Sequence, residues 1–200
     1  MNSIISKIKS SINIKTKPRN LKIFEFTKII NPEYLFVGDN VVIDDFCLLY
    51  AKKEAPIRIG SWVHIACFSS LTGGKITLGN FVGISGGCRI YAGSEDYKNG
   101  AFMNPPIPEK YRNVNRSGCI FKDFSFIGAN SCVLPGVTIA EGAVAGTGSI
   151  VRKDLEPWGI YIMRDGKMVK IKERDKKKMI QNSVRLKKEF QNIRLAKFGI

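Results

Sequence analysis

Residues 121–151 read FKDFSFIGANSCVLPGVTIAEGAVAGTGSIV, and apolar side chains recur in this stretch at every sixth position. A small or β-branched residue stands four positions after each of the first five apolar residues. The apolar series is Phe121, Ile127, Val133, Ile139, Ala145 and Val151, and the small series is Ser125, Ser131, Val137, Ala143 and Ser149. A phase kept over so many repeats indicates a structural period.

A six-residue period is the signature of a parallel β-helix. Six residues are too few for a helix and a loop, but they suit one short strand followed by a corner. Each face of the coil then turns one large and one small side chain inward, and three faces complete one triangular turn. The sequence therefore predicts an all-β fold, a parallel β-helix.

The same phase continues upstream with interruptions, and it predicts a coil over residues 37–156 with about five turns. A short extra segment spans residues 52–58 and a long one spans residues 96–120. The upstream anchors are Val37, Ile43, Leu49, Ile59, Ile65, Leu71, Leu78, Ile84 and Ile90, and the small positions are Val41, Cys47, Val63, Ser69, Val82, Cys88 and Ser94.

The formal net charge of +15 is concentrated at the two ends of the 200-residue chain. Residues 37–150 carry 10 Lys and Arg against 9 Asp and Glu, whereas residues 1–36 carry 7 against 2 and residues 151–200 carry 15 against 6. A basic tail could attract nucleic acid, an anionic membrane face or a phosphorylated ligand, or it could be a solvated lysine-rich surface. No nucleic-acid motif or aromatic-basic interleaving is present, so nucleic acid is not expected as a partner. Peripheral contact with the cytoplasmic membrane face stays open.

Localisation in the cytoplasm is expected from three observations. No stretch approaches the ~20 apolar residues of a membrane span. The N-terminus, MNSIISKIKSSINIK, has no continuous apolar segment of the kind found in secretory signals. The five cysteines are an odd number without a CxxC spacing, and Cys47 and Cys88 fall in small inward positions, which suits reduced core residues.

The chain length suits one domain with two appended ends. We expect residues 1–36 to be an N-terminal extension packed on the coil, residues 37–156 to be the coil, and residues 157–200 to be a basic segment with an α-helix. The apolar residues at helical spacing after Ile171 are Met179, Leu186, Phe190 and Ile193. This helix is expected to dock on the end of the coil or on a neighbouring subunit.

The long interruption reads DYKNGAFMNPPIPEKYRNVNRSGCI over residues 96–120. A long loop on a stiff scaffold is the usual place for function. Its three prolines and its aromatic residues favour an ordered arm. The arm could serve the active site, contact a neighbouring subunit, or do both.

The hexapeptide run, the loop after SEDY and the ending AGTGSIVRKDLEPWGIY resemble the left-handed β-helix acyltransferases, in the branch of galactoside, maltose and polysaccharide O-acetyltransferases. The resemblance covers roughly residues 37–172. It implies a left-handed coil, a homotrimer, and acetyl-CoA bound as the acyl donor in clefts between adjacent subunits. It implies no metal.

In that family the long loop commonly opens with a histidine that takes a proton from the acceptor hydroxyl. Glu95 stands at the matching position here, where it could be the catalytic base, bind the acceptor or lie at a solvated loop entry. His64 is the single histidine and the other candidate base, although a lone histidine is more often structural. His64 of one subunit could face Glu95 of another. The acceptor-binding candidates are Ala66, Asp96 and Tyr97.

The resemblance also assigns a donor site. Ala129 and Thr147 match positions whose main-chain groups hold the pantetheine arm, and Phe126 matches an aromatic residue at the acetyl end. The basic residues that match those near the phosphates of CoA are Arg152, Lys153, Lys167 and Lys170. The turn before Lys167 departs from the family's Gly-x-Pro-Ala, because residues 163–166 read MRDG.

These features predict an acetyl-CoA-dependent O-acetyltransferase that acts on a sugar in cell-surface polysaccharide or lipopolysaccharide biosynthesis. One alternative is N-acylation of an amino-sugar nucleotide, because a neutral amine needs less help from a base than a hydroxyl does. Another alternative is a non-catalytic β-helix scaffold.

Overall fold

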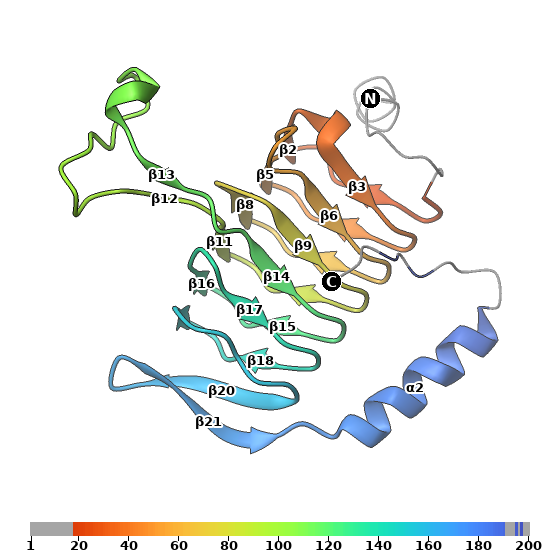
Figure 1. Ribbon diagram of the computed structural model, residues 1–200. Coiled ribbons are helices and arrows are strands. Elements are labelled where there is room, and N and C mark those ends of the chain that lie inside the picture. Colours follow the sequence, from red (N-terminus) through yellow and green to blue (C-terminus); the bar gives the residue numbers. More distant parts are fainter. Residues whose placement is uncertain (1–17, 191–194, 196, 198–200) are drawn as a thin grey trace.

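The computed structural model describes residues 18–190, 195 and 197, and it shows a parallel β-solenoid of about seven turns (Figure 1). Successive turns place their strands in three sheets, which we name A, B and C, and the first five turns contribute one strand to each. Sheet A contains β1 (Lys22–Ile23), β4 (Val42–Ile43), β7 (His64–Ile65), β10 (Gly83–Ile84), β15 (Phe126–Ile127), β18 (Val144–Ala145), β20 (Gly159–Arg164) and β21 (Lys167–Glu173). Sheet B contains β2 (Lys28–Ile30), β5 (Leu48–Tyr50), β8 (Ser70–Thr72), β11 (Arg89–Tyr91), β16 (Cys132–Val133) and β19 (Ile150–Val151). Sheet C contains β3 (Leu35–Val37), β6 (Ile57–Ile59), β9 (Ile76–Leu78), β14 (Cys119–Phe121) and β17 (Thr138–Ile139).

The six-residue series forms the core of the coil, as the sequence predicts. All six of its apolar residues are fully buried, and so are the small residues between them. Parallel pairing stacks the same position of successive turns, so that Ile84 lies between Ile65 and Ile127. The period therefore sets both the length of each face and the register between turns. The predicted fold class is confirmed.

The coil is longer than predicted at both ends. Strands β1, β2 and β3 pair with β4, β5 and β6, so residues 18–36 form the first turn rather than an extension packed on the coil. Residues 1–17 of the expected extension lie outside the described residues. At the other end, Tyr161 in β20 pairs with Ala145 and adds a further turn. These additions account for about seven turns where about five were expected.

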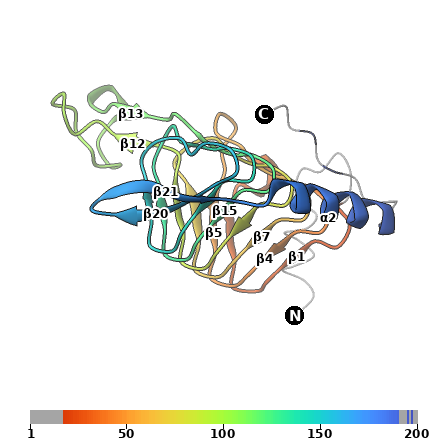
Figure 2. The same cartoon turned by 90° about the horizontal axis from the view of Figure 1, so that it is seen from below.

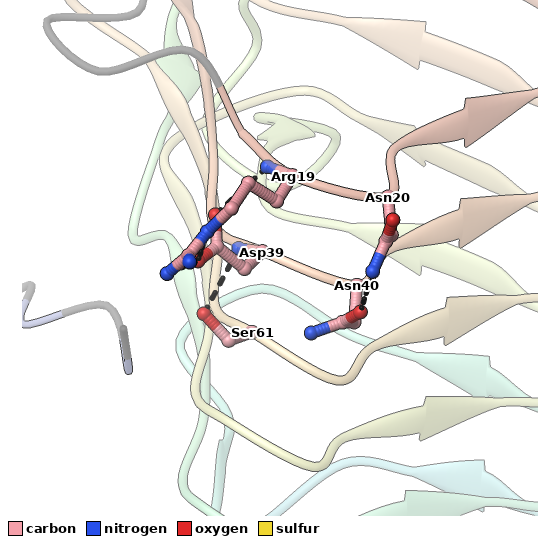
Figure 3. A network of polar contacts seen from close by, with 5 residues as sticks. All are labelled: Arg19, Asn20, Asp39, Asn40 and Ser61. Atoms are coloured by element: carbon pink, nitrogen blue, oxygen red, sulfur yellow. Dashed lines mark hydrogen bonds and ion pairs between the residues drawn. The ribbon is translucent and has the colours of Figure 1, made fainter. Parts of the chain in front are cut away.

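A polar network joins the first turns of the coil (Figure 3). The backbone N–H and the guanidinium of Arg19 donate to the buried carboxylate of Asp39, and the Asp39 N–H donates to Ser61 Oγ at 3.0 Å. Beside them, Asn20 Nδ2 donates to Asn40 Oδ1 at 2.8 Å. The side chains of Asp39 and Ser61 thus satisfy backbone N–H groups of the turn before their own, and those of Asn80 and Asp123 do the same further along the coil.

The long insertion leaves the coil between β11 and β14 as an arm (Figure 1). Its base is an antiparallel pair, β12 (Ser94–Glu95) with β13 (Val114–Asn115), and it carries the short helix η2 (Glu109–Tyr111). A second short helix, η1 (Pro32–Tyr34), precedes β3. Ser94 is exposed in β12, so its predicted inward position is wrong, because the chain has already left the coil there.

After the β20–β21 hairpin, helix α2 (Lys176–Glu189) lies beside the coil (Figures 1 and 2). The Asp175 side chain caps its first turn by accepting from the Lys178 N–H at 2.9 Å. The helix confirms the expected helical tail, although Ile193 of the predicted stripe lies outside the described residues. Within residues 18–190, no helix is long and apolar enough to cross a membrane.

Candidate active site

The last turns of the coil and the β20–β21 hairpin line a pocket of about 430 Å³, which we call the basic pocket. Three of the four basic residues that the sequence assigns to the donor site lie together in its wall. The lining residues are Ile150, Arg152, Lys153, Asp154, Leu155, Tyr161, Gly166, Lys167 and Met168. The hairpin thus brings Lys167 back to the turn that carries Arg152 and Lys153.

The three cations of the basic pocket have no ion-pair partner within the part of the chain that the structure describes. Asp154 also lines the pocket, but its Oδ1 accepts a hydrogen bond from the Thr138 N–H at 2.7 Å. Three unpaired cations that converge on one pocket suit an anionic ligand with several phosphates.

Lys170 does not line the basic pocket. Its Nζ lies 2.6 Å from Glu173 Oε1 and 4.0 Å from Glu156 Oε2. The hydrogen bond to Glu173 raises the pKa of Lys170. The structure therefore places this predicted phosphate contact in an ion pair on the hairpin.

The corner between sheets A and B, which we call the A–B corner, runs along the coil toward the basic pocket. Ala129 and Thr147 occupy the same position of this corner in successive turns, and the Gly148 N–H donates to the Ala129 carbonyl at 2.8 Å. A Cβ on Gly128 would lie 2.4 Å from the Thr147 nitrogen, so the two turns are in backbone contact. This corner offers backbone rather than side chains to a ligand, which suits the predicted role of these two residues.

The outer face of sheet A carries two further predicted residues. His64, Gly83 and Phe126 stand in register on β7, β10 and β15. The Phe126 ring covers Gly83, where an added Cβ would meet a ring carbon at 2.6 Å. Phe126 is 39% exposed, so it offers an apolar wall on the side of sheet A toward His64.

His64 is held by a carboxylate of the preceding turn. Its Nε2 lies 2.9 Å from Asp44 Oδ2, and both side chains are accessible to solvent. Such a pair fixes the orientation of the imidazole and leaves the other ring nitrogen available. Ala66 follows at the start of the A–B corner, and the equivalent residue of the next turn is Ser85.

Glu95 lies at the base of the arm and contacts Arg112. The Arg112 guanidinium pairs with Glu95 Oε1, and the side chains of Arg112 and Glu95 are 12% and 27% exposed. Glu95 Oε2 and Arg112 Nε are buried and have no hydrogen-bond partner among the described residues. Within a single chain the carboxylate is thus paired with the arginine through Oε1, and Oε2 has no hydrogen-bond donor among the described residues.

Asp96 and Tyr97, the other predicted acceptor contacts, differ in their surroundings. The Asp96 carboxylate accepts hydrogen bonds from Lys98, Asn99 and Asn113. These bonds, those from the Asn99 side chain first, lower the pKa of Asp96 to about 2. Tyr97 is 69% exposed. Asp96 therefore holds the base of the arm together, and Tyr97 is free to contact another molecule.

Ser85 is a further candidate for the site, which the sequence reasoning did not select. It lies between Ala66 and Gly128 on the A–B corner and is partly exposed. Glu95 stands four residues after β11 and Ser85 four residues before it, so the two lie at opposite ends of this sheet B strand. Within one chain, neither Ser85 nor His64 meets Glu95. A serine inside a Gly-rich hexapeptide gives no signal that separates it from a corner residue.

An Escherichia coli dTDP-4-amino-4,6-dideoxy-D-glucose acyltransferase is 33% identical to the chain over 174 residues, which cover 86% of the chain and 89% of that enzyme. The crystal structure of AntD, an N-acyltransferase from Bacillus cereus, in complex with dTDP and 3-hydroxybutyryl-CoA superposes with a TM-score of 0.84. The identity to AntD is 34%, and the match covers 95% of this chain and 97% of AntD. Other AntD structures carry replacements of a serine or of an aspartate ten residues further along.

A maltose O-acetyltransferase from Clostridium difficile 630 matches with a TM-score of 0.51 and 15% identity, over 88% of this chain and 79% of that chain. The resemblance to O-acetyltransferases is thus shown for the fold alone. No family profile matches the chain. The identity to the two amino-sugar enzymes extends over almost the full length of both partners, as membership of one family requires. The chain is an acyltransferase and belongs to the hexapeptide-repeat β-helix family that includes both of these enzymes.

Proposed function

We propose that this protein transfers an acyl group from acyl-CoA to the amine of a dTDP-linked amino sugar of the dTDP-4-amino-4,6-dideoxyglucose type. The observation that carries the proposal is the near full-length similarity to two acyltransferases of such sugars, one of them crystallised with that sugar nucleotide and CoA. This choice favours the alternative of N-acylation over the O-acetylation that the sequence suggested first.

The donor site of the proposal runs from the basic pocket along the A–B corner. Arg152, Lys153 and Lys167 hold phosphates of the CoA moiety, and the backbone at Ala129 and Thr147 lies beside the pantetheine arm. Phe126 lies at the acyl end. AntD binds 3-hydroxybutyryl-CoA, so the acyl group transferred here need not be acetyl.

In the proposed reaction, the neutral amine attacks the thioester carbonyl, the C–N bond forms, and the C–S bond breaks. CoA leaves as the thiol, and the attacking nitrogen loses one proton. Ser85 and Glu95 are ten residues apart, as are the serine and the aspartate replaced in AntD. We therefore assign them to the amine, with Ser85 Oγ orienting it and the Glu95 carboxylate accepting the proton. His64, held by Asp44, is the second candidate for the base.

The arrangement of these residues favours an oligomer. Ser85 and Glu95 belong to opposite ends of β11 in one chain, so a site that uses both needs Glu95 from a neighbouring subunit. A homotrimer, as the resemblance implies, supplies three such sites. The buried and unpartnered Glu95 Oε2 is consistent with a hydrogen-bond donor provided from outside the chain.

The proposal is tested by incubating the protein with acyl-CoA and dTDP-4-amino-4,6-dideoxyglucose and measuring thiol release. An amide product survives mild alkali, whereas an ester is cleaved. Acetyl-CoA and 3-hydroxybutyryl-CoA are compared to identify the acyl group. Thiol release with hydroxyl sugars, and none with the amino sugar, would reject the proposal.

The donor site is tested separately by thermal shift, because a ligand that binds the native state raises the melting temperature. Millimolar acetyl-CoA should raise it in the wild type and less in Lys153→Ala. Lys170→Ala is the matched control, since Lys170 is paired with Glu173 away from the pocket. An unchanged melting temperature in the wild type would favour the non-catalytic scaffold.

A further inference from the structure

Three phenylalanine rings stack on the A–B corner toward the N-terminal end of the coil. We call Phe26, Phe46 and Phe68 the phenylalanine ladder. Their ring centroids are 5.4 Å and 5.0 Å apart, and adjacent ring planes are inclined by 6° and 7°. The side chains are 62%, 54% and 56% exposed. A contiguous exposed aromatic surface of this kind marks a binding site.

The backbone at these positions does not favour phenylalanine. Phe46 and Phe68 have φ values of 60°, in the left-handed region that bulky residues avoid. In the following turns the same corner position is occupied by Gly87, Asn130 and Gly148, which are residues that tolerate this conformation. Aromatic residues with φ near +60° recur in this coil, since Phe81, Phe124 and Trp158 share the conformation on another corner, so it is the exposure of Phe46 and Phe68 that sets them apart.

A second aromatic ladder on the coil provides a comparison. Trp62, Phe81, Phe124 and Trp158 stack on the corner that precedes sheet A. The segment that contains α2 covers them, since Phe190 packs against Trp62 and Lys176 lies over Trp158. Phe124 and Trp158 are accordingly only 9% and 6% exposed. Within the described residues, no such segment covers the phenylalanine ladder.

The position of the ladder points to its ligand. Along the A–B corner from the basic pocket come Thr147, Ala129, Ser85 and then Phe68. If acyl-CoA occupies the A–B corner from the basic pocket to Ser85, the acceptor must reach Ser85 from the N-terminal side of the coil. An acceptor in that position lies over the phenylalanine ladder. This inference rests on the proposed function, which requires a nucleotide sugar as the acceptor.

We propose that the phenylalanine ladder binds the nucleobase of the sugar nucleotide by stacking. A planar base packs on an aromatic ring without needing a hydrogen-bond code. Phe46 is the one ring partner of Phe68 in the described chain, and the next rung is Gly87, which has no side chain. Asn130 Oδ1 occupies the side-chain space of Gly87, 2.2 Å from the place of a Cβ there. Phe68, which is 56% exposed, therefore offers the stacking surface at this end of the ladder, with the Asn130 side chain beside it.

Arg89 adds positive charge at this end of the ladder. Its guanidinium donates to the carbonyls of Phe68 and Gly87, the second at 3.1 Å, and the residue is exposed. A cation next to an aromatic stack suits a ligand that joins a base to a diphosphate.

The test uses dTDP as the probe and isothermal titration calorimetry as the measurement. Phe68→Leu and Phe46→Leu keep an apolar side chain but remove the ring, and each should weaken dTDP binding at least tenfold. Binding of acetyl-CoA should stay within twofold of the wild type. Phe68→Trp retains a stacking surface and should keep dTDP affinity. Phe36→Leu is the matched control, because Phe36 lies on sheet C beneath the Arg58 guanidinium.

Unchanged dTDP affinity in both leucine variants, or no dTDP binding by the wild type, would overturn the ladder site. Size-exclusion chromatography of the same variants is the second readout. Dissociation of the assembly would show that the ladder is a contact between copies instead. The proposed function is rejected by a different result. If the wild type binds dTDP through Phe68 but acylates no amino sugar, the ladder site is supported and the proposed activity is rejected. If acylation proceeds with a KM that is independent of Phe46 and Phe68, the ladder site alone falls.

Discussion

Gly142 shows how closely successive turns of this coil approach each other. Its φ is +68°, and a Cβ there would lie 2.4 Å from the Trp158 ring. Gly148 has nearly the same φ, +69°, and no atom within 4 Å of the corresponding Cβ. A comparison of Gly142 with Gly148 therefore separates the cost of the left-handed backbone conformation from the cost of contact with the next turn.

Gly142→Ala should destabilise the protein more than Gly148→Ala does. Both substitutions place alanine in the left-handed region, which costs about 1–2 kcal/mol. Gly142→Ala also forces the Trp158 ring to move, which adds about 1–3 kcal/mol. Thermal unfolding monitored by circular dichroism measures the difference. Equal melting temperatures would show that the Trp158 ring moves without cost.

The Asp96 carboxyl should titrate well below its ordinary value. Its pKa is about 2 against 3.8, because Asn99, Lys98 and Asn113 donate to the ionised form. The folded-state pKa is lowered, so the stabilising contribution of Asp96 is present above about pH 4 and is lost as the pH falls toward 2. Carbon-detected NMR of the side-chain carboxyl measures the midpoint. A midpoint near 3.8 would mean that the turn at residues 96–99 is open in solution.

At the scale of elements, helix α2 depends on its contact with the coil. A helix of 14 residues is marginal in isolation, so packing must hold it. Ser183 is its one buried residue, and Arg174, which precedes the helix, anchors the segment by donating to the Phe124 and Gly142 carbonyls, the second at 3.2 Å. Burial of the guanidinium lowers the pKa of Arg174, because desolvation disfavours the charged form.

Arg174→Met should loosen α2 while the coil stays folded. It removes two hydrogen bonds from a charged donor and leaves two carbonyls without them, at a cost of about 1–3 kcal/mol. Amide hydrogen exchange should accelerate over residues 176–189 and stay unchanged in the core strands. Arg185→Met, on the exposed side of the helix, is the control. The same acceleration in both variants would show that the anchor does not hold the helix.

The elements differ in how far the sequence predicts them. The uninterrupted hexapeptides were placed correctly because one buried side chain per face repeats without a gap. The first turn was missed, although Ile23 and Ile29 keep the period, because an insertion between β2 and β3 shifts the phase before Val37. The last turn was missed because the phase shifts after Val151, so that Leu155 pairs with Ile139 and Tyr161 with Ala145 at a spacing of 16 residues instead of 18. Pairing with a neighbouring turn stabilises both despite the irregular spacing.

At the scale of the whole molecule, the separation of Ser85 from Glu95 predicts complementation between subunits. Ser85→Ala and Glu95→Gln should each lower kcat/KM by about 10²-fold or more, because in the proposed reaction each removes a group assigned to the amine. After the two inactive variants are mixed, unfolded and refolded together, activity should return to about one quarter of the wild type, since each site draws one residue from each of two subunits.

Refolded mixtures of either variant with itself are the control for this experiment. Sedimentation equilibrium measures the oligomeric state in parallel. No recovery from a mixture that forms the wild-type oligomer would place both residues of each site in one subunit, or remove one of them from the mechanism.

The sequence by itself determined the coil, its buried columns and a concentration of basic residues near its C-terminal end. These properties follow from local periodicity and from charges close together in the chain. Only the tertiary structure decided that Lys167 faces Arg152 and Lys153 while Lys170 does not, because the register of the β20–β21 hairpin sets the direction of each side chain. It also showed that Glu95 pairs with Arg112, and that three phenylalanines spaced by about twenty residues form one exposed stack. The physical reason is that residues of a solenoid become neighbours when they occupy the same position in successive turns. Insertions change the number of residues in each turn, so spacing in the sequence does not show which residues become neighbours.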